Sequence, residues 1–244
     1  MKIYTPLFII VLLFSACQKE LEPFNPVVEA TSPTYETLGD FNQEGKPGYL
    51  VTPDVISSDL TTFITNTFPE NQDLRNSNPG LLAGPANGDI SITQSSEVFL
   101  TFVTQGTVYK NTIAFYTYPT NTPPDSVNDI KTITYIFPNA GGGTPLLPGD
   151  KVRIGRFGAG TSIGFVLLKD AYNNSTHKIN NSTPHYSSND ILNPEVNSDL
   201  KKHAVLVDYP TDNIVLIGFE DIDRTLPGCD HDFNDVVVYA TIKR

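Results

Sequence analysis

The residues best suited to chemistry lie near the C-terminus, where Asp230, Asp232 and Asn234 stand at alternating positions. A curled loop can turn three such side-chain oxygens toward one centre, as positions 1, 3 and 5 of a calcium loop do. Because calcium takes six to eight oxygen ligands, more donors are needed. Three further acidic residues stand close by, namely Glu220, Asp221 and Asp235. The sequence therefore predicts a Ca²⁺ site formed by these side chains.

The motif departs from an EF-hand. Its sixth position is Asp235 instead of Gly, its twelfth is Thr241 instead of Glu, and a β-type run follows where an EF-hand has a helix. The alternative is that these carboxylates cap turns and accept backbone N–H bonds in an acidic protein. Several carboxylates in one short loop repel one another unless a cation lies between them. We therefore prefer the calcium interpretation.

No other group of residues predicts a metal or catalytic centre as clearly. The four histidines lack the spacing of a zinc site and stand at His177, His185, His203 and His231. The glycine-rich stretches at 141–143 and 155–160 lack the features of a phosphate loop and are interpreted as turns. Glu97 and Glu195 stay open as a carboxylate pair for glycoside hydrolysis, although nothing in the sequence selects them. We therefore expect no enzyme and keep a hydrolase as the least favoured alternative.

A run of aromatic residues offers a second kind of site. The rings belong to Tyr109, Phe115, Tyr116 and Tyr118, and together they would form a platform for sugar rings. Alternation along a strand puts Phe115 on one face and Tyr116 with Tyr118 on the other, so at least one set belongs to the core. The chain has no tryptophan, which lowers the expectation of a sugar site. A carbohydrate-binding component of a glycan-uptake system is therefore the alternative function.

The charge balance limits the partners. The chain of 244 residues has 16 Lys and Arg against 27 Asp and Glu, for a net charge of −11. It lacks the basic surface that binds phosphate backbones, so we expect no nucleic-acid partner. Its 39% hydrophobic and 10% aromatic residues argue against disorder. A metal cation is the more natural charged partner.

The N-terminus has the features of a targeting segment. Lys2 precedes an apolar run at residues 6–14 that is far shorter than the roughly 20 residues of a membrane-spanning helix. Residues 14–17 (FSAC) resemble the lipobox of bacterial lipoproteins, in which the cysteine becomes the acylated N-terminus. The sequence therefore predicts a signal peptide at 1–16 and a membrane anchor through acyl chains on Cys17.

The segment after the anchor predicts where the protein is held. Residues 18–22 (QKELE) resemble the acidic tag that sends lipoproteins of Bacteroidetes-type bacteria to the outer face of the outer membrane. Residues 17–47 have no sustained hydrophobic periodicity and are rich in Pro, Glu, Thr, Ser and Gly, so we expect a flexible tether. With Cys17 acylated only Cys229 remains, and no intrachain disulfide is expected.

Strands are the elements that must position the acidic motif. Apolar residues at helical spacing predict one short helix between Ser57 and Pro69. Eight runs rich in β-branched and aromatic residues predict strands at 97–104, 112–118, 132–137, 151–155, 162–168, 204–208, 213–219 and 236–242. The polar stretch 172–201 is expected to be a surface loop. The fold class is therefore all-β, an antiparallel β-sandwich of jelly-roll type with one short N-terminal helix.

The acidic segments also carry a family resemblance. Residues 218–222 (GFEDI) and 230–237 (DHDFNDVV) are similar to the signature of the LruC-domain family of exported bacterial proteins. Upstream segments fit that family in the same order, so the resemblance extends from about residue 48 to 242. Residues 224–229 depart from it where the family has a Gly-rich turn. The resemblance implies an exported, often lipid-anchored β domain of unestablished function and supplies no catalytic mechanism.

Together these inferences give one folded domain over residues 48–244. We expect a non-enzymatic outer-membrane lipoprotein exposed at the cell surface. Its calcium-stabilised sandwich would serve in adhesion, binding or envelope structure, with a protein or glycan as its ligand.

Overall fold

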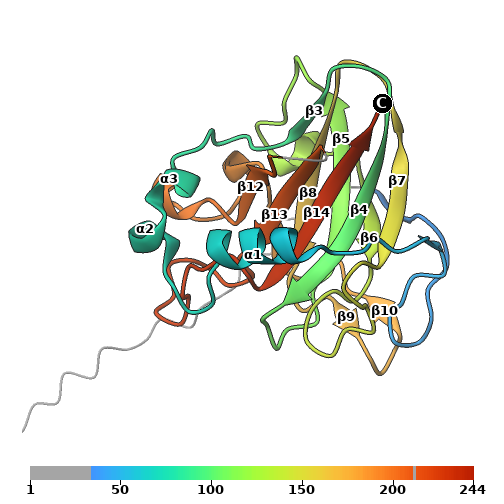
Figure 1. Ribbon diagram of the computed structural model, residues 1–244, viewed down its shortest axis with the longest axis horizontal. Coiled ribbons are helices and arrows are strands. Elements are labelled where there is room, and N and C mark those ends of the chain that lie inside the picture. The colour runs from blue at the N-terminus through green and yellow to red at the C-terminus, as the bar shows by residue number, and fades with distance from the viewer. Residues whose placement is uncertain (1–33, 211–212) are drawn as a thin grey trace, which may run out of the picture.

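The computed structural model describes residues 34–210 and 213–244, and in it two six-stranded sheets face one another (Figure 1). The first sheet consists of β1 (Thr34–Thr37), β3 (Ile90–Ile92), β5 (Thr112–Pro119), β6 (Thr132–Phe137), β8 (Thr161–Leu168) and β11 (His185–Ser187). The second consists of β2 (Leu50–Val51), β4 (Ser96–Gln105), β7 (Lys151–Phe157), β12 (Ala204–Asp208), β13 (Ile214–Phe219) and β14 (Val236–Lys243). A small separate hairpin pairs β9 (Tyr172–Asn173) with β10 (Lys178–Ile179).

The strand order shows which segments become neighbours. The first sheet runs β1-β6-β5-β8-β11, with β3 also paired to β8, and the second runs β12-β13-β14-β4-β7-β2. Pairing within the two sheets is antiparallel apart from β1 beside β6. The C-terminal β14 therefore lies in the middle of the second sheet, between β13 and β4 (Figure 1).

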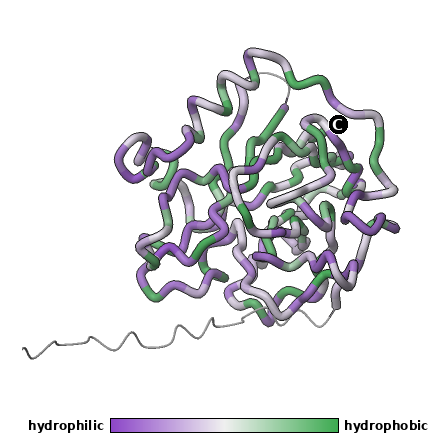
Figure 2. Tube along the Cα trace, turned by 90° about the horizontal axis from the view of Figure 1, so that it is seen from below, coloured by the Kyte–Doolittle hydropathy of each residue, from purple (hydrophilic) through white to green (hydrophobic). Residues whose placement is uncertain are grey.

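The main core lies between the sheets, because successive strand residues point to opposite faces. Val98, Leu100 and Phe102 of β4 point into it and are nearly inaccessible to solvent. In Figure 2, hydrophobic stretches of the trace are frequent inside the molecule, and hydrophilic stretches are frequent on its outside. Burial of these apolar side chains is the main contribution to folding.

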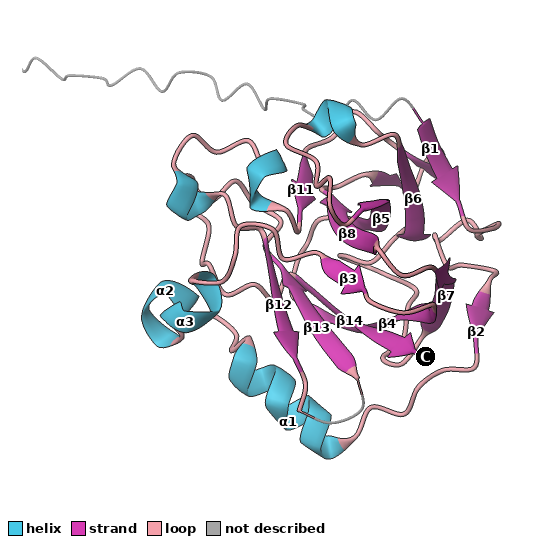
Figure 3. Ribbon diagram, turned by 90° about the horizontal axis from the view of Figure 1, so that it is seen from above, coloured by secondary structure: helices cyan, strands magenta, loops and turns pink. Residues whose placement is uncertain are grey.

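The helix α1 (Ser58–Thr67) covers part of the outer face of the second sheet (Figure 3). The Ser57 hydroxyl accepts a hydrogen bond from the Leu60 amide at 3.1 Å and caps the helix. Leu60 and Ile64 pack with Leu216 and Tyr239 in a second apolar cluster. After α1 the chain continues through α2 (Leu74–Ser77) and α3 (Pro79–Leu82) toward β3. No helix in the described part of the chain has the length and hydropathy to cross a membrane.

The expected fold class, an all-β antiparallel sandwich, is confirmed. The eight predicted strands correspond to β4 to β8 and β12 to β14, and their ends agree within two residues. The predicted helix is α1. The four-residue helices α2 and α3 were not expected, because a single turn is too short for an apolar period to show.

The folded region begins earlier than the composition predicts. Residues 34–47 were expected to belong to a tether, but β1 pairs with β6 in parallel register. The Tyr35 ring stacks on Tyr135 with centroids 5.8 Å apart, and its hydroxyl lies 3.1 Å from Nε2 of His185. The predicted signal peptide, Cys17 and the first half of the predicted tether lie outside the described residues.

The stretch 172–201 is not only a surface loop. Its strand β11 pairs with β8, and Tyr186 is 3% exposed. Its polar side chains are buried because they satisfy backbone groups that would otherwise be unpaired. Asn193, for example, donates to the carbonyl oxygens of Ser187 and Lys201 at 2.9 and 2.7 Å. The polar composition of residues 172–201 therefore predicted a surface loop where part of the segment is a paired strand with buried polar side chains.

Candidate metal centre

The acidic residues meet at one end of the second sheet, where β13 ends and β14 begins. Strands β13 and β14 are antiparallel neighbours, so the end of β13 lies beside the start of β14. Phe219 pairs with Val236, which brings Glu220 next to the residues that precede β14. The Glu220 amide donates to the carbonyl oxygen of His203 at 2.9 Å, and this bond fixes the end of β13 to the start of β12. The two acidic segments therefore lie side by side.

The loop before β14 is curled by two residues in the left-handed region. His231 and Phe233 both have φ of 59°, a conformation that costs a non-glycine residue about 1–2 kcal/mol. Packing offsets this cost, because Phe233 is fully buried and the Arg224 guanidinium lies 5.0 Å from its ring centre. The same guanidinium donates to His231 Nδ1 at 3.1 Å. This curl shapes the loop that carries Asp230 and Asp232.

Three carboxylates converge in this arrangement. Glu220, Asp230 and Asp232 each offer one oxygen, and these oxygens all lie within 4.8 Å of one another. Calcium binds oxygen at about 2.4 Å, so ligands on opposite sides of one ion are about 4.8 Å apart. Glu220 and Asp232 are buried and Asp230 is exposed. The geometry therefore fits a single cation reached from solvent beside Asp230.

Glu220 is the buried centre of this cluster. Its side chain hydrogen-bonds Cys229 and Asp235, but its Oε2 atom has no hydrogen-bond partner within the described residues. Burial, and after it the charge of Asp230, raises the pKa of Glu220 to about 7. A buried carboxylate is stabilised as an anion only by donors or by a positive charge. A cation at this position would supply what the protein groups do not.

Asp232 has a different environment. Its Oδ2 accepts the Asn71 amide at 2.9 Å, and its Oδ1 accepts the Asn234 amide at 3.1 Å. Burial is the first cause that raises its pKa, to about 6. Asp232 therefore caps a turn, as the alternative interpretation of the motif expects, and also faces the cluster.

The other predicted ligands lie beside this cluster. The Asp235 carboxylate accepts the Asp221 amide at 2.8 Å, and the Asp221 carboxylate accepts Nδ2 of Asn111 at 2.5 Å. Burial raises the pKa of Asp221, and burial with the charge of Asp221 raises that of Asp235 to about 10. Asn234, the sixth predicted ligand, directs its amide oxygen toward Gly106. Asp235 also shares a hydrogen bond with Glu220. The predicted set of six therefore consists of the three-carboxylate cluster, an Asp221–Asp235 pair that contacts it through Glu220, and Asn234.

Residues that hold the site escaped the sequence analysis. Arg224 is 2% exposed and donates to the carbonyl oxygen of Lys202 at 2.9 Å. His203 lies 2.6 Å from a Glu195 oxygen and 2.9 Å from the carbonyl oxygen of Glu220. Neither contact has a sequence signal, because the partners lie on different strands and loops. The one sequence signal at this place was that residues 224–229, which begin with Arg224, depart from the Gly-rich turn of the LruC-domain family.

The residues of the two alternative sites, the aromatic platform and the Glu97–Glu195 pair, do not come together. Phe115 belongs to the core between the sheets, and Tyr116 is buried on the opposite face of β5. Glu97 forms an exposed ion pair with Arg153 on the second sheet, whereas Glu195 is buried against His203. The aromatic platform and the Glu97–Glu195 pair therefore find no support in this arrangement.

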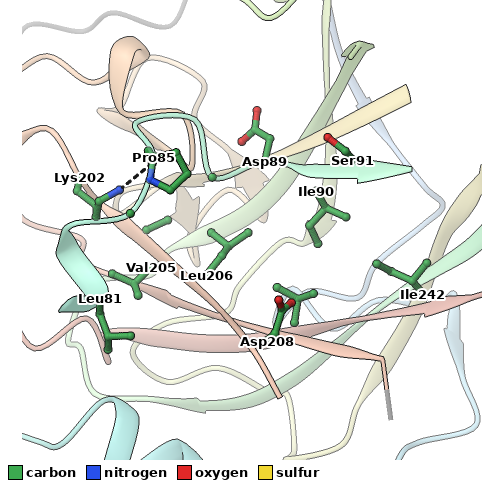
Figure 4. Close-up of a pocket in the computed structure, with 14 residues that line it drawn as sticks. Leu81, Pro85, Asp89, Ile90, Ser91, Lys202, Val205, Leu206, Asp208 and Ile242 are labelled. Atoms are coloured by element: carbon green, nitrogen blue, oxygen red, sulfur yellow. Dashed lines mark hydrogen bonds between the residues drawn. The ribbon is translucent and has the colours of Figure 1, made fainter. Parts of the chain in front are cut away.

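A pocket of about 360 Å³ lies between β3 and β12, away from the acidic cluster (Figure 4). Ile90 and Leu206 contribute apolar walls. Lys202 is held by an ion pair with Asp190 at 2.8 Å, and the Asp89 carboxylate accepts bonds from three hydroxyl groups. Lys202 and Asp89 are therefore both engaged within the protein.

Fold and site together define a two-sheet β-sandwich with an acidic centre where β13 ends and β14 begins. Residues 157–243, which include β8 and all later strands, match a family described as a domain of unknown function (DUF4114). The match supports the resemblance at this coarser level, that of a C-terminal domain of unknown function. No curated protein and no solved structure matches the chain.

Proposed function

We propose that this protein is a calcium-stabilised, non-enzymatic β-sandwich module. The observation that carries the proposal is the convergence of Glu220, Asp230 and Asp232 around one point, with a buried Glu220 oxygen that has no partner in the described residues. Calcium would neutralise the mutual repulsion of these carboxylates and join the end of β13 to the loop before β14.

The donor set favours calcium over zinc. All three converging ligand atoms are carboxylate oxygens, which suit hard cations. Cys229 is buried and its pKa is raised by burial, so its thiol is not an available thiolate. His231 Nδ1 already accepts the Arg224 guanidinium. The thiol stays protonated and hydrogen-bonds Glu220, so the three carboxylates are the ligands that remain for a cation.

The wider role that we propose is a lipoprotein held through Cys17 on the outer face of the outer membrane. There the sandwich would serve in adhesion, binding or envelope structure, with a protein or glycan as its ligand. The lipobox-like segment supports the anchor, and the acidic tag after it supports surface exposure. The dispersed alternative sites support a binding or structural role over catalysis.

Asp230→Asn tests the calcium site. Asp230 is exposed and accepts no hydrogen bond within the described residues, so the variant removes ion binding with little effect on the fold. At one hundred times Kd, calcium stabilises by about 2.7 kcal/mol, and each 1 kcal/mol raises Tm by roughly 2–4 °C for a domain of this size. We expect millimolar calcium to raise the wild-type Tm by several degrees, measured against chelator, and to leave the variant unchanged.

Asp208→Asn is the matched control, since Asp208 is also exposed and lies on β12 outside the cluster. It should keep the full calcium increment. Magnesium should substitute poorly, because it demands tight octahedral geometry. Wild-type melting curves that coincide in calcium and in chelator, with no calcium found by elemental analysis, would refute the proposal.

A further inference from the structure

Beyond helix α1, the outer face of the second sheet carries a group of basic side chains. Helix α1 packs against Tyr239, and in Figure 1 it crosses in front of β13 and β14 while the C-terminal end of β14 lies beyond it. Strands β7 and β14 supply the basic residues there, which are Lys151, Arg153, Arg156 and Lys243. A chain with a net charge of −11 therefore has a local group of cations on one face of a sheet.

The strand register places these side chains in rows across three strands. In one row, Glu97 of β4 pairs with Arg156 on one side and with Lys243 on the other. In the next row, Phe99 of β4 pairs with Arg153. Residues directly opposite one another lie on the same face of a sheet, with Cβ atoms about 5 Å apart. The basic residues and the ring of Phe99 therefore form one continuous surface.

The ring of Phe99 lies among the cations. Nζ of Lys243 is 4.9 Å from the ring centre, and Nζ of Lys151 is 5.7 Å from it. Both distances fall within the range of a cation–π contact. An aromatic ring held between two ammonium groups thus marks the centre of this face.

The charges on this face are only partly compensated. Arg153 pairs with Glu97 at 2.7 Å, and Lys151 pairs with Asp54. Arg156 and Lys243 form no ion pair within residues 34–210 and 213–244, so four cations against two carboxylates leave a surplus of two positive charges. At physiological ionic strength charges are screened beyond about 8 Å. A ligand at this face is therefore exposed mainly to the surplus and little to distant carboxylates.

A cleft of about 270 Å³ borders this face where α1 begins. Ser57 caps α1, Tyr239 and Thr241 belong to β14, and Tyr209 follows β12. Because Thr241 pairs in register with Phe99, the cleft and the ring are neighbours. Hydroxyl groups and aromatic rings are typical side-chain types of ligand sites. The cleft therefore extends the face and leaves room for a further unit of a ligand chain.

We propose that this face binds an acidic polysaccharide. Carboxylate or sulfate groups of the ligand pair with Arg156 and Lys243, and a sugar ring packs against Phe99. The inference rests on the binding role proposed above and gives it a ligand class and a surface, but it does not require the calcium site.

An anionic membrane is the other surface that basic residues attract. Membrane binding also needs apolar side chains that enter the lipid. Phe99 is only partly exposed, whereas Arg156 and Lys243 are exposed, so the charged groups meet an approaching surface first. This arrangement favours a glycan, and binding to lipid vesicles is an alternative outcome of the test.

The test measures binding of the full chain to immobilised glycans by biolayer interferometry, in chelator and in calcium. The probes are polygalacturonate, which carries carboxylates, heparin, which carries sulfates, and neutral dextran. All forms carry Cys17→Ser, so that acyl chains do not enter vesicles in the parallel lipid assay. We expect binding to an acidic glycan in chelator, no binding to dextran, and weaker binding as salt is added. The two acidic probes show which anion is preferred.

Two variants test the residues of the face. Arg156→Gln with Lys243→Gln removes the two cations that lack an ion pair, and Phe99→Leu removes the ring but keeps an apolar side chain. Each should raise the apparent Kd about tenfold or more, because a few charged and aromatic residues carry most of the energy of an interface. Lys131→Gln with Lys178→Gln is the matched control, since both lysines are exposed and lie outside the second sheet. It should bind like wild type.

The Tm of the double variant at Arg156 and Lys243 should stay at the wild-type value, because both residues are exposed. This comparison separates loss of binding from loss of the fold. No binding of wild type to either acidic glycan, or undiminished binding in the double variant, would overturn the inference. Either result leaves the calcium site standing, since the Tm increment lost in Asp230→Asn tests that site alone.

Two further outcomes would also overturn the inference. Binding to vesicles of phosphatidylglycerol and phosphatidylcholine without binding to glycans would assign the face to a membrane. Glycan binding that requires calcium and persists in the double variant would place the glycan at the acidic centre.

Discussion

At the scale of single residues, the acidic motif has two roles, to hold a turn and to face the proposed ion, and Asp232 and Asp230 differ in them. Asp232 accepts two backbone amides and therefore also holds the turn. Asp230 is exposed and accepts no hydrogen bond within the described residues. A substitution at Asp232 would therefore lower the free energy of unfolding with or without calcium. A substitution at Asp230 removes no hydrogen bond of the turn, and in chelator it relieves part of the repulsion that raises the pKa of Glu220.

Calcium affinity should depend on pH through Glu220. A protonated carboxyl cannot bind the ion, so binding competes with protons. Since the pKa of Glu220 is raised from 4.5 to about 7, calcium affinity should fall on the order of tenfold between pH 8 and pH 6. Without calcium the sign for folding is opposite: stability is present below pH 4.5 and is lost as Glu220 ionises through its folded pKa.

Titration calorimetry at pH 6, 7 and 8 measures this effect. The pKa of His231 is lowered to about 4, by burial first and then by Arg224, so its charge stays constant over this range. An affinity that does not change with pH would show that Glu220 is not a ligand. Asp208→Asn, whose carboxylate lies outside the cluster, should reproduce the wild-type pH profile.

At the scale of elements, β1 is attached to the domain by backbone pairing with β6 and by the side chain of Tyr35. Tyr35 stacks on Tyr135 and bonds His185, while Thr34, Glu36 and Thr37 are exposed. A short edge strand of this kind has no apolar alternation long enough to be recognised from sequence. It closes the free edge of β6, which would otherwise be open to pairing with another chain.

Tyr35→Ala should therefore destabilise the domain. Loss of the stacked ring and its hydrogen bond should cost about 1–3 kcal/mol, measured by denaturant unfolding. Glu36→Ala is the control on the same strand, because Glu36 is exposed and should change the stability by less than about 0.5 kcal/mol. Equal unfolding midpoints for Tyr35→Ala and wild type would mean that the Tyr35 side chain contributes nothing to stability.

At the scale of the whole molecule, only five of the 27 Asp and Glu residues lie in or beside the acidic centre, so the net charge of −11 is a property of the whole chain. The folded part starts at residue 34 or before, so the proposed tether is shorter than its composition predicts. A shorter tether would hold the sandwich closer to the membrane surface.

Cys17→Ser tests the proposed anchor. Acylation needs the cysteine sulfur, so the variant should leave the membrane fraction while the purified domain keeps the wild-type Tm. Cys229→Ser is the matched control: it alters a buried thiol within the domain and should stay with the membranes. A Cys17→Ser protein that sediments with outer membranes at wild-type levels would contradict the lipoprotein proposal.

The sequence by itself determined what depends on neighbours along the chain. The alternation of apolar residues predicted the long strands such as β4 and β14. Ser57, followed by apolar residues at helical spacing, predicted α1. Asp230 and Asp232, which stand at alternate positions, predicted a loop whose carboxylates could face one ion. These signals are local, because side-chain direction repeats every two residues in a strand and about every four in a helix.

Only the tertiary structure decided which acidic groups share a site. The register of β13 against β14 placed Glu220 with Asp230 and Asp232 and left Asp221 with Asp235. It also brought Arg224 beneath Phe233. No periodic pattern or fixed spacing in the sequence predicts these contacts, because each joins two segments that are separated by loops. The acidic residue types could therefore be read from the sequence, whereas the packing of the sheets decides which of them converge.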